Sequence, residues 1–209
     1  MQRKEASTQA ELDTIVAAGD IAIVRLGYFC VRESSHVVAR GSSHVEAWGS
    51  SHVVASKYVS VAIFQDKKGK VIGGIQIVPD YSTVKKWLDY QGVPVAKDRA
   101  VVLYKAVTDT FHSGHGFLYT PGTTTTAPGW DGEKRECGGG LHLCPSPAQA
   151  KVFHPEATKF LACTVAVEDL ALGPMPLQYP NKIKARHIGK IVEVDYFTGN
   201  ARKEQHADG

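Results

Sequence analysis

The chain has few cysteines, no long hydrophobic run and no block of like charge. Its four cysteines are Cys30, Cys137, Cys144 and Cys163. So few cysteines do not make a disulfide scaffold and are typical of a reduced setting. No stretch approaches the roughly 20 apolar residues of a membrane-spanning helix, and no hydrophobic signal region follows the polar start. We therefore expect a soluble, cytoplasmic protein without a membrane partner.

Charge of either sign is also modest. The 24 basic and 21 acidic side chains leave a formal charge of +3, which does not favour nucleic acid as a partner. Hydrophobic residues make up 43% of the 209 residues, enough to bury a core in one or two domains.

A short internal repeat dominates the first third of the sequence. Residues 34–56 contain three near-copies of one octamer, SSHVVARG, SSHVEAWG and SSHVVAS. The fourth and sixth positions of each copy are always Val and Ala, whereas the fifth and seventh vary. Because side chains alternate across a strand, this period of two predicts short strands with an inward Val/Ala face and an outward variable face that includes Glu46 and Trp48.

The small inward residues favour a thin coil over a thick sandwich core. One octamer spans about 26 Å at roughly 3.3 Å per residue, so each copy forms one side of the coil and two or three copies complete a turn. We predict a short β-solenoid, with a β-meander of repeated hairpins as the alternative. His36, His44 and His52 recur with the octamer and suggest a metal-binding or pH-sensing ladder, but in a two- or three-sided coil consecutive copies lie on different sides.

The flanking segments predict the ends of this first module. Thr8 and Glu11 form a capping-box pattern at the start of an amphipathic helix that ends near Gly19 and caps the coil. Residues 21–33 have the composition of strands that lead into the repeat. Residues 57–65 and 70–78 flank the turn-like sequence Asp66-Lys67-Lys68-Gly69, which predicts a hairpin.

The sequence after the repeat predicts a second domain with a different composition of secondary structure. Ser82 and Thr83 open a short helix before Gly92 and Pro94, so we place the repeat domain at residues 1–80, a helix and linker at 81–98, and a second domain at 99–209. The second domain reads as α+β: strands around residues 100–107, 141–144, 159–170 and 182–195, and a helix opened by Pro145-Ser146-Pro147. The fold class is therefore mainly β, with an N-terminal β-solenoid and a C-terminal α+β domain.

Residues 111–140 form a long segment without periodicity, and such loops are usually functional or mobile. The polar residues around it allow two chemical interpretations. His112, His115, Cys137, His142 and Cys144 are the residue types that bind zinc, although their spacing fits no standard zinc motif. Alternatively, Cys137 or Cys144 acts as a nucleophile beside a histidine, with the backbone N–H groups of the following glycines as an anion nest. We do not favour a metal.

A third interpretation comes from a resemblance. The segments VLYKAV (102–107), GGGLHLCPSPAQAKVF (138–153) and KFLACTVAVEDL (159–170) occur in an order similar to the ADP-ribosyltransferase fold, including the poly-ADP-ribose polymerases and, more closely, the RNA 2′-phosphotransferases. The arrangement of repeat and C-terminal domain also resembles uncharacterised bacterial and bacteriophage proteins with Ser-x-Val-x-Ala repeats. The first of these two resemblances implies an ADP-ribosyltransferase-like layout of the second domain, with NAD as cofactor or substrate.

The same resemblance implies roles for individual residues. Lys105 stands where the fold's first-strand histidine contacts the ribose, and His142 where its tyrosine stacks on the nicotinamide. Glu193 is the candidate to stabilise an oxocarbenium cation during cleavage of the nicotinamide–ribose bond. The residues expected to hold the cofactor are Tyr104, Gly138, Gly139, Gly140 and Ser146. The phosphate-gripping arginines of the phosphotransferases have no counterpart, which argues against RNA repair.

The sequence thus predicts binding or cleavage of NAD or a related nucleotide by the second domain. The alternative is a non-catalytic module that binds a protein partner or forms homo-oligomers through the repeat, with Trp48 and Trp130 as exposed anchors.

Overall fold

The computed structural model describes residues 1–65, 69–175 and 177–201. The chain is mainly β and divides into two compact units, Met1–Pro79 and Asp80–Gly209. Each unit has its own sheets and core.

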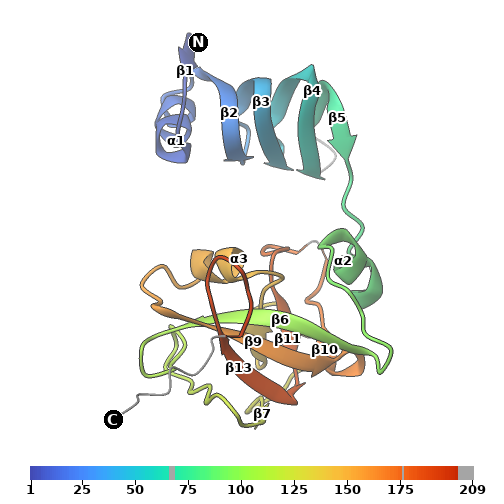
Figure 1. The fold of residues 1–209 in the computed structure, drawn as a ribbon. Helices are drawn as coiled ribbons and strands as arrows, with labels where there is room; N and C mark the ends of the chain where they lie inside the picture. Colours follow the sequence, from blue (N-terminus) through green and yellow to red (C-terminus); the bar gives the residue numbers. More distant parts are fainter. Residues whose placement is uncertain (66–68, 176, 202–209) are drawn as a thin grey trace. The chain divides into compact units, whose positions relative to one another are not determined.

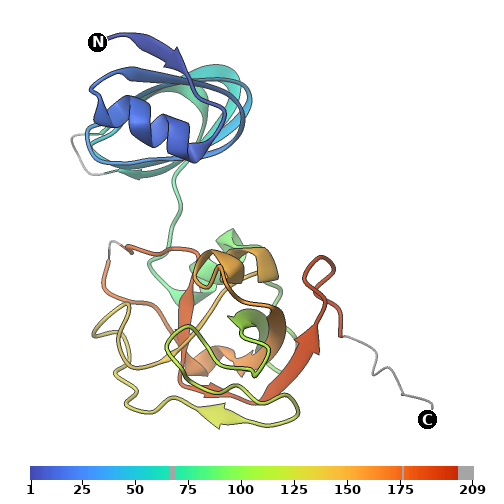
Figure 2. The same cartoon turned by 90° about the vertical axis from the view of Figure 1, so that its left-hand side faces the viewer.

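The first unit is one parallel sheet with a helix. Its elements are β1 (Arg3–Glu5), α1 (Gln9–Ala17), β2 (Ile21–Val31), β3 (His36–Gly49), β4 (His52–Gln65) and β5 (Lys70–Ile77). The strands pair in the order β1-β2-β3-β4-β5, and every pair is parallel. They stand side by side in Figure 1. Viewed from the α1 end in Figure 2, the long strands curve and their traces overlap in a flattened ring.

The octamer repeat sets the register of this sheet. Val37 of β3 pairs with Val53 of β4, and Ala39 pairs with Ala55, a step of two octamers. The inward face predicted from the repeat is confirmed, because the invariant Val and Ala side chains are buried whereas Arg40 is exposed. Gly41 and Gly49, in the two Gly-Ser-Ser corners, have φ values of 60° and 56°, a region that favours glycine. A side chain at Gly41 would also collide with the Arg25 carbonyl, whose oxygen lies 2.5 Å from an ideal Cβ.

The histidines of the repeat do not form one ladder. The rings of His36 and His52 stack at 4.7 Å between centroids. The His44 ring stacks instead on Tyr28, and its Nδ1 lies 3.1 Å from the Ser60 hydroxyl. Consecutive copies therefore contribute to different columns, as expected for two octamers per register step.

One prediction and one alternative from the sequence are wrong. Strands β4 and β5 do not form a hairpin: they pair in parallel, with His52 opposite Lys70. The parallel pairing of β2 to β5 also excludes a β-meander. The turn-like composition before Lys70 is a local feature. The pairing follows the inward column in which Val37 and Val53 are buried and Val71 is partly buried. Residues 66–68 of the predicted turn lie outside the described residues.

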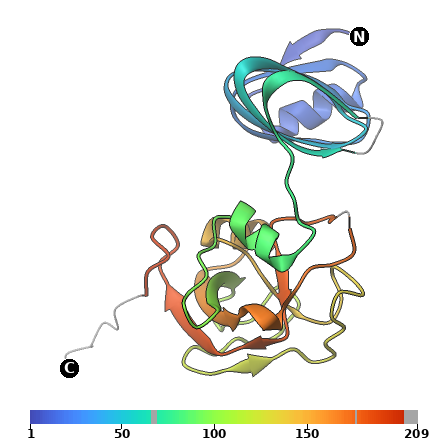
Figure 3. The same ribbon diagram turned by 90° about the vertical axis from the view of Figure 1, so that its right-hand side faces the viewer.

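Helix α1 covers the β1–β2 end of the first unit (Figure 2). The predicted capping box is present: the Thr8 side chain accepts from the Glu11 backbone N–H, and the Glu11 carboxylate accepts from the Thr8 N–H. Leu12 and Ile15 join the Val/Ala core. Figure 3 shows the same unit from its β5 end.

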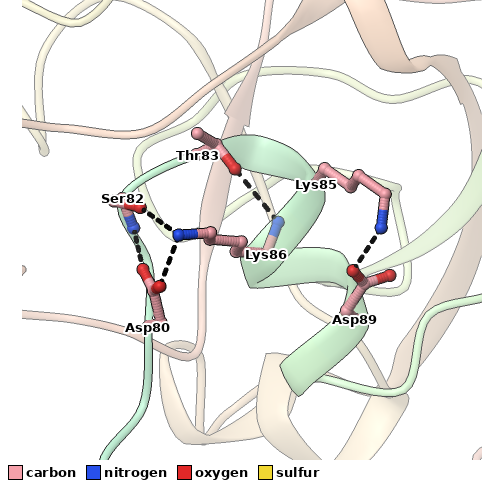
Figure 4. A network of polar contacts seen from close by, with 6 residues as sticks. All are labelled: Asp80, Ser82, Thr83, Lys85, Lys86 and Asp89. Carbon is pink, nitrogen blue, oxygen red and sulfur yellow. Dashed lines mark hydrogen bonds and ion pairs between the residues drawn. The ribbon is translucent and has the colours of Figure 1, made fainter.

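Helix α2 (Val84–Tyr90) belongs to the second unit. It begins as predicted, because the Thr83 hydroxyl accepts from the Lys86 N–H, and ion pairs of Lys86 with Asp80 and of Lys85 with Asp89 surround its first turns (Figure 4). Trp87 is fully buried, and its Nε1 donates to the Pro180 carbonyl at 2.7 Å. This helix is thus packed on the second unit and does not act as a free connector.

The second unit contains short sheets, a 3-10 turn and a short helix. The elements after α2 are β6 (Ala100–Val107), β7 (Thr125–Thr126), β8 (Leu141–Leu143), α3 (Pro147–Val152), β9 (Lys159–Ala166), η1 (Val167–Asp169), β10 (Leu170–Ala171), β11 (Ile183–Ala185), β12 (His187–Ile188) and β13 (Lys190–Val194). The sheets have the orders β13-β9-β6, β10-β11-β8 and β12-β7, all antiparallel. The stretch expected as one strand near residues 182–195 is divided into β11, β12 and β13.

Candidate functional site

The site begins where strands β6 and β8 separate. Tyr104 and Cys144 exchange two backbone hydrogen bonds, of 2.7 and 2.9 Å. They form an isolated bridge between the two three-stranded sheets of the second unit. In a regular antiparallel ladder the next hydrogen-bonded pair would be Ala106 with His142. Instead, the His142 carbonyl accepts from Lys105 Nζ at 2.9 Å, and the Ala106 carbonyl lies 3.4 Å from His154 Nδ1. Side chains thus take the place of the backbone partners.

A cavity of about 690 Å³ occupies this separation, and we call it the β6–β8 cavity. Its walls come from β6, β8, α3, the loop 113–140 and the segment before β11. Its basic and imidazole side chains are Lys105, Lys182, His115, His142 and His154. Its aromatic side chains are Tyr104, Phe117, Tyr119, Phe153 and Tyr179. None of its lining residues in the described part of the chain is acidic, so the cavity has the electrostatic character of an anion site.

Lys105 lies on the β6 wall of the cavity. Its ammonium lies 5.3 Å from the centre of the Tyr119 ring, in addition to its bond to the His142 carbonyl. No ion pair of Lys105 with a carboxylate occurs among the described residues. Burial lowers the pKa of the Lys105 ammonium, and the charge of Lys182 lowers it further. An anion in the cavity would supply the missing partner.

His142 lies on β8, and its ring contacts the loop that precedes this strand. Its Nε2 donates to the Glu136 carbonyl at 3.1 Å. Burial, together with the charges of Lys182, Lys105 and Lys184, lowers the pKa of His142 to about 4. The ring is therefore neutral at physiological pH, suited to stacking or hydrogen bonding and not to acting as a cation.

A glycine triplet, Gly138, Gly139 and Gly140, forms the rim of the cavity between Cys137 and β8. The loop before it is held by a buried ion pair: Lys184 Nζ donates to Asp131 Oδ1 and to the Arg135 carbonyl, both at 2.6 Å. Lys184 holds the pKa of Asp131 at about 2. No larger residue fits at Gly139 as the loop stands, since a Cβ there would lie 1.7 Å from the Gly129 carbonyl oxygen.

Glu136 links this loop to the segment that carries Lys182. Its two carboxylate oxygens accept from the backbone N–H groups of Gln178 and Tyr179, at 2.7 and 2.6 Å. Glu136 therefore fixes the Tyr179 end of the cavity wall against the glycine triplet. The ammonium of Lys182 lies 4.1 Å from the Tyr179 ring centre and 3.1 Å from Cys137 Sγ.

The cysteines differ sharply in their surroundings. All four are free, and Cys137 is exposed whereas Cys144 and Cys163 are buried. Burial raises the pKa of the Cys144 thiol to about 12, and that of Cys163 likewise to about 12. Cys144 is consequently a protonated thiol in the wall of the cavity and a poor nucleophile.

The described residues contain no cluster of possible metal ligands that would support the zinc interpretation. Within the ranges that the structure covers, no group of three or more His, Cys, Asp or Glu side chains is placed to hold a metal ion. Cys137 contacts Lys182, His142 contacts Glu136, and the His112 ring contacts Thr110.

The residues proposed from the resemblance fall into two groups. Lys105, His142, Tyr104 and the glycine triplet all line the β6–β8 cavity. Ser146 does not line it: its hydroxyl caps α3 by accepting from the Gln149 N–H. Glu193 lies on β13, 3.8 Å from Lys159 in an ion pair, and is not part of the cavity lining either.

Sequence reasoning missed part of the wall. Lys182, Tyr179, Phe153 and His154 line the cavity, but Tyr179 and Lys182 come from an aperiodic segment whose position depends on Glu136, 42 residues or more away. The one signal in the sequence that points to this part of the wall is the aromatic and basic composition of residues 179–184.

Comparison with known proteins finds one similar family, whose function is unknown. A family described as a domain of unknown function (DUF7666) matches residues 101–195, a range that includes every residue lining the β6–β8 cavity. No curated protein and no solved structure matches the chain. Among the described residues, no helix is long and apolar enough to cross a membrane. The chain is thus similar, across the whole of its candidate site, to the family DUF7666.

Proposed function

We propose that the second unit binds NAD or an NAD-related nucleotide in the β6–β8 cavity. The observation that carries this proposal is the pairing of uncompensated cations with aromatic rings in one hollow. Lys105 and Lys182 supply positive charge, and the lining is free of acidic side chains in the described part of the chain. The volume of about 690 Å³ lies in the range of small-molecule and cofactor sites.

One wall of the cavity suits a planar ring. The neutral His142 imidazole lines the cavity beside the point where β6 and β8 separate. A neutral ring can stack on a cationic nicotinamide without charge repulsion, which a protonated imidazole would not allow. Lys105, which donates from β6 to the His142 carbonyl, is the group that would contact ribose or phosphate.

An ADP-ribosyltransferase-like layout is part of the same proposal. It is supported by the succession β6, β8, α3 and β9. The ADP-ribosyltransferase fold has the same order of a first strand, a second strand, a small-residue helix and a hydrophobic strand. We propose binding ahead of cleavage, because Glu193 does not contribute to the cavity. For the first unit we propose a β-solenoid of two octamers per turn, supported by the parallel pairing of His36 with His52.

A thermal titration of the full chain tests the binding proposal. A ligand that binds only the folded state at 100 times its Kd stabilises it by about 2.7 kcal/mol, so saturating NAD should raise the melting temperature of the second unit by about 5 °C or more. The same titration followed by tryptophan fluorescence reports on Trp130, whose ring lies 5.5 Å from Lys184 Nζ beside the glycine triplet. If millimolar NAD and ADP-ribose leave both signals unchanged, the proposal is wrong.

A second function is supported by the surface of the first unit. Val38, Val54 and Ile72 form an outward column along β3, β4 and β5, and Val54 and Ile72 are 48% and 51% exposed. Such an aliphatic column suits homo-oligomerisation or a protein partner. Light scattering across a concentration series tests homo-oligomerisation: a Val54→Lys, Ile72→Lys variant should be monomeric where the original chain is not. A chain that stays monomeric at millimolar concentration contradicts homo-oligomerisation through this column.

A further inference from the structure

The backbone N–H groups of the glycine triplet have no hydrogen-bond partner among the described residues. They lie at the cavity rim, directly after Cys137 and before β8. Peptide N–H groups carry partial positive charge, and those without a protein partner can donate to an anion. Glycine is needed there for space, because a Cβ at Gly138 would lie 1.9 Å from Asp131 Oδ2.

The ammonium group of Lys182, in the segment before β11, lies beside the glycine triplet. Lys182 Nζ contacts Cys137 Sγ, the residue that precedes the triplet, at 3.1 Å. The rings of Tyr179 and Phe153 lie 4.1 and 5.0 Å from this ammonium and hold it by cation–π contacts. No ion pair of Lys182 with a carboxylate occurs in the part of the chain that is described.

The two segments are fixed to one another and not merely adjacent. The Glu136 carboxylate, one residue before Cys137, accepts from the Tyr179 N–H, three residues before Lys182. The Lys184–Asp131 ion pair joins the same loop to the strand that follows Lys182. The cation and the glycine N–H groups are therefore held in one arrangement before any ligand arrives, which reduces the entropy cost of binding.

We propose that Lys182 and the backbone N–H groups of Gly138, Gly139 and Gly140 form a diphosphate subsite. The subsite takes ligands with a diphosphate group, and in the β6–β8 cavity this makes diphosphate-bearing nucleotides the substrate class, ahead of nucleosides. The inference rests on the proposed function for the rest of the ligand, but the diphosphate contact itself does not require NAD.

Amide NMR of the ¹⁵N-labelled full chain tests the subsite. NAD, ADP and inorganic pyrophosphate should each shift the amide signals of the glycine triplet, whereas nicotinamide riboside, which lacks phosphate, should leave them in place. Lys182→Gln should weaken the three diphosphate ligands at least tenfold, and Lys182→Arg, which keeps the charge, should restore binding to within a few-fold. Lys190→Gln is the matched control, because Lys190 is exposed on β13 and does not line the cavity.

The outcomes separate the two proposals. If NAD shifts the Tyr104 and Lys105 amides but not the triplet, and Lys182→Gln binds NAD like the Lys190→Gln control, the subsite is wrong and the proposed function stands. If pyrophosphate shifts the triplet through Lys182 while NAD and nicotinamide riboside leave Tyr104 and Lys105 unchanged, the subsite stands and the proposed function fails. Shifts from pyrophosphate that are spread over exposed lysines and insensitive to Lys182→Gln also overturn the subsite.

Discussion

Lys105 Nζ donates to the His142 carbonyl at 2.9 Å, across the line where β6 and β8 stop pairing. This contact joins two of the three residues assigned to the reaction centre from the sequence, one from each three-stranded sheet of the second unit. It also explains how the sheets can separate at low cost, because a carbonyl that loses its ladder partner must find another donor. The group that satisfies it is the Lys105 side chain, which also lines the cavity.

The pH dependence of stability should report on His142. Its pKa is about 4 in the folded chain, below the ordinary value of 6.5. Between these values the unfolded chain binds a proton that the folded chain does not, so the free energy of unfolding falls as the pH drops from 6.5 to 4. His142→Gln keeps an N–H donor for Glu136 and should remove up to about one proton of this uptake. Urea midpoints at several pH values measure it. His115→Gln, in the exposed part of the loop, is the control, and equal slopes in the two variants would contradict the assignment.

Glu136 should act by positioning the Tyr179–Lys182 segment. Glu136→Ala removes two acceptors for backbone N–H groups, and hydrogen bonds to a charged group contribute about 1.5–3 kcal/mol each before exposure reduces them. We expect a stability loss of about 1–3 kcal/mol and weaker binding of diphosphate ligands. Glu133→Ala, an exposed change in the same loop, should alter neither. Denaturant unfolding and calorimetry are the measurements, and unchanged ligand affinity in Glu136→Ala would show that the clamp does not shape the site.

Cys137 should be the reactive cysteine of the second unit. It is exposed beside Lys182, whereas the thiols of Cys144 and Cys163 are buried with pKa values of about 12. A maleimide should therefore label Cys137 at least about a hundredfold faster than the buried pair, since the thiolate is the reactive form. Peptide mass spectrometry over time gives the rates, and inorganic pyrophosphate should protect Cys137. Labelling of Cys144 at a comparable rate would mean that the cavity opens more widely than the structure shows.

Substitution by leucine should destabilise the first unit at an inward position of the octamer but not at the neighbouring outward position. Ala39 is fully buried in the inward column, and Arg40, the next residue, is exposed. Ala39→Leu should overpack the narrow core and cost about 1–3 kcal/mol, whereas Arg40→Leu should change stability by less than about 0.5 kcal/mol. Thermal unfolding of both variants is the measurement. Similar losses in the two would contradict the assignment of faces.

The sequence predicted local structure well where the signal was local. The Thr8–Glu11 capping box and the Thr83 cap lie where their residue types placed them. The invariant Val and Ala of the octamer predicted the buried face because period two is a direct consequence of strand geometry. The hairpin before Lys70 was wrong because turn composition says nothing about which neighbour a strand will join.

The candidate site was predictable only in part. Lys105 and His142 were named from the resemblance in the order of the segments, and both line the cavity, but nothing local showed that Ser146 would cap α3 or that Glu193 would pair with Lys159. Lys182 was missed because its place at the rim depends on the contact of Glu136 with Tyr179, between segments that have no common pattern. Long-range contacts between aperiodic segments leave no periodic trace in a single sequence.

Isothermal titration calorimetry of the full chain with NAD tests the central claim most directly, in parallel with Lys105→Met and the exposed-site control Lys190→Met. We predict saturable binding at one equivalent in the original chain and in Lys190→Met. In Lys105→Met we predict binding at least about tenfold weaker, a loss of about 1.4 kcal/mol or more. No heat of binding in the original chain, or equal affinity in Lys105→Met and the control, would contradict the assignment of the β6–β8 cavity as a nucleotide site.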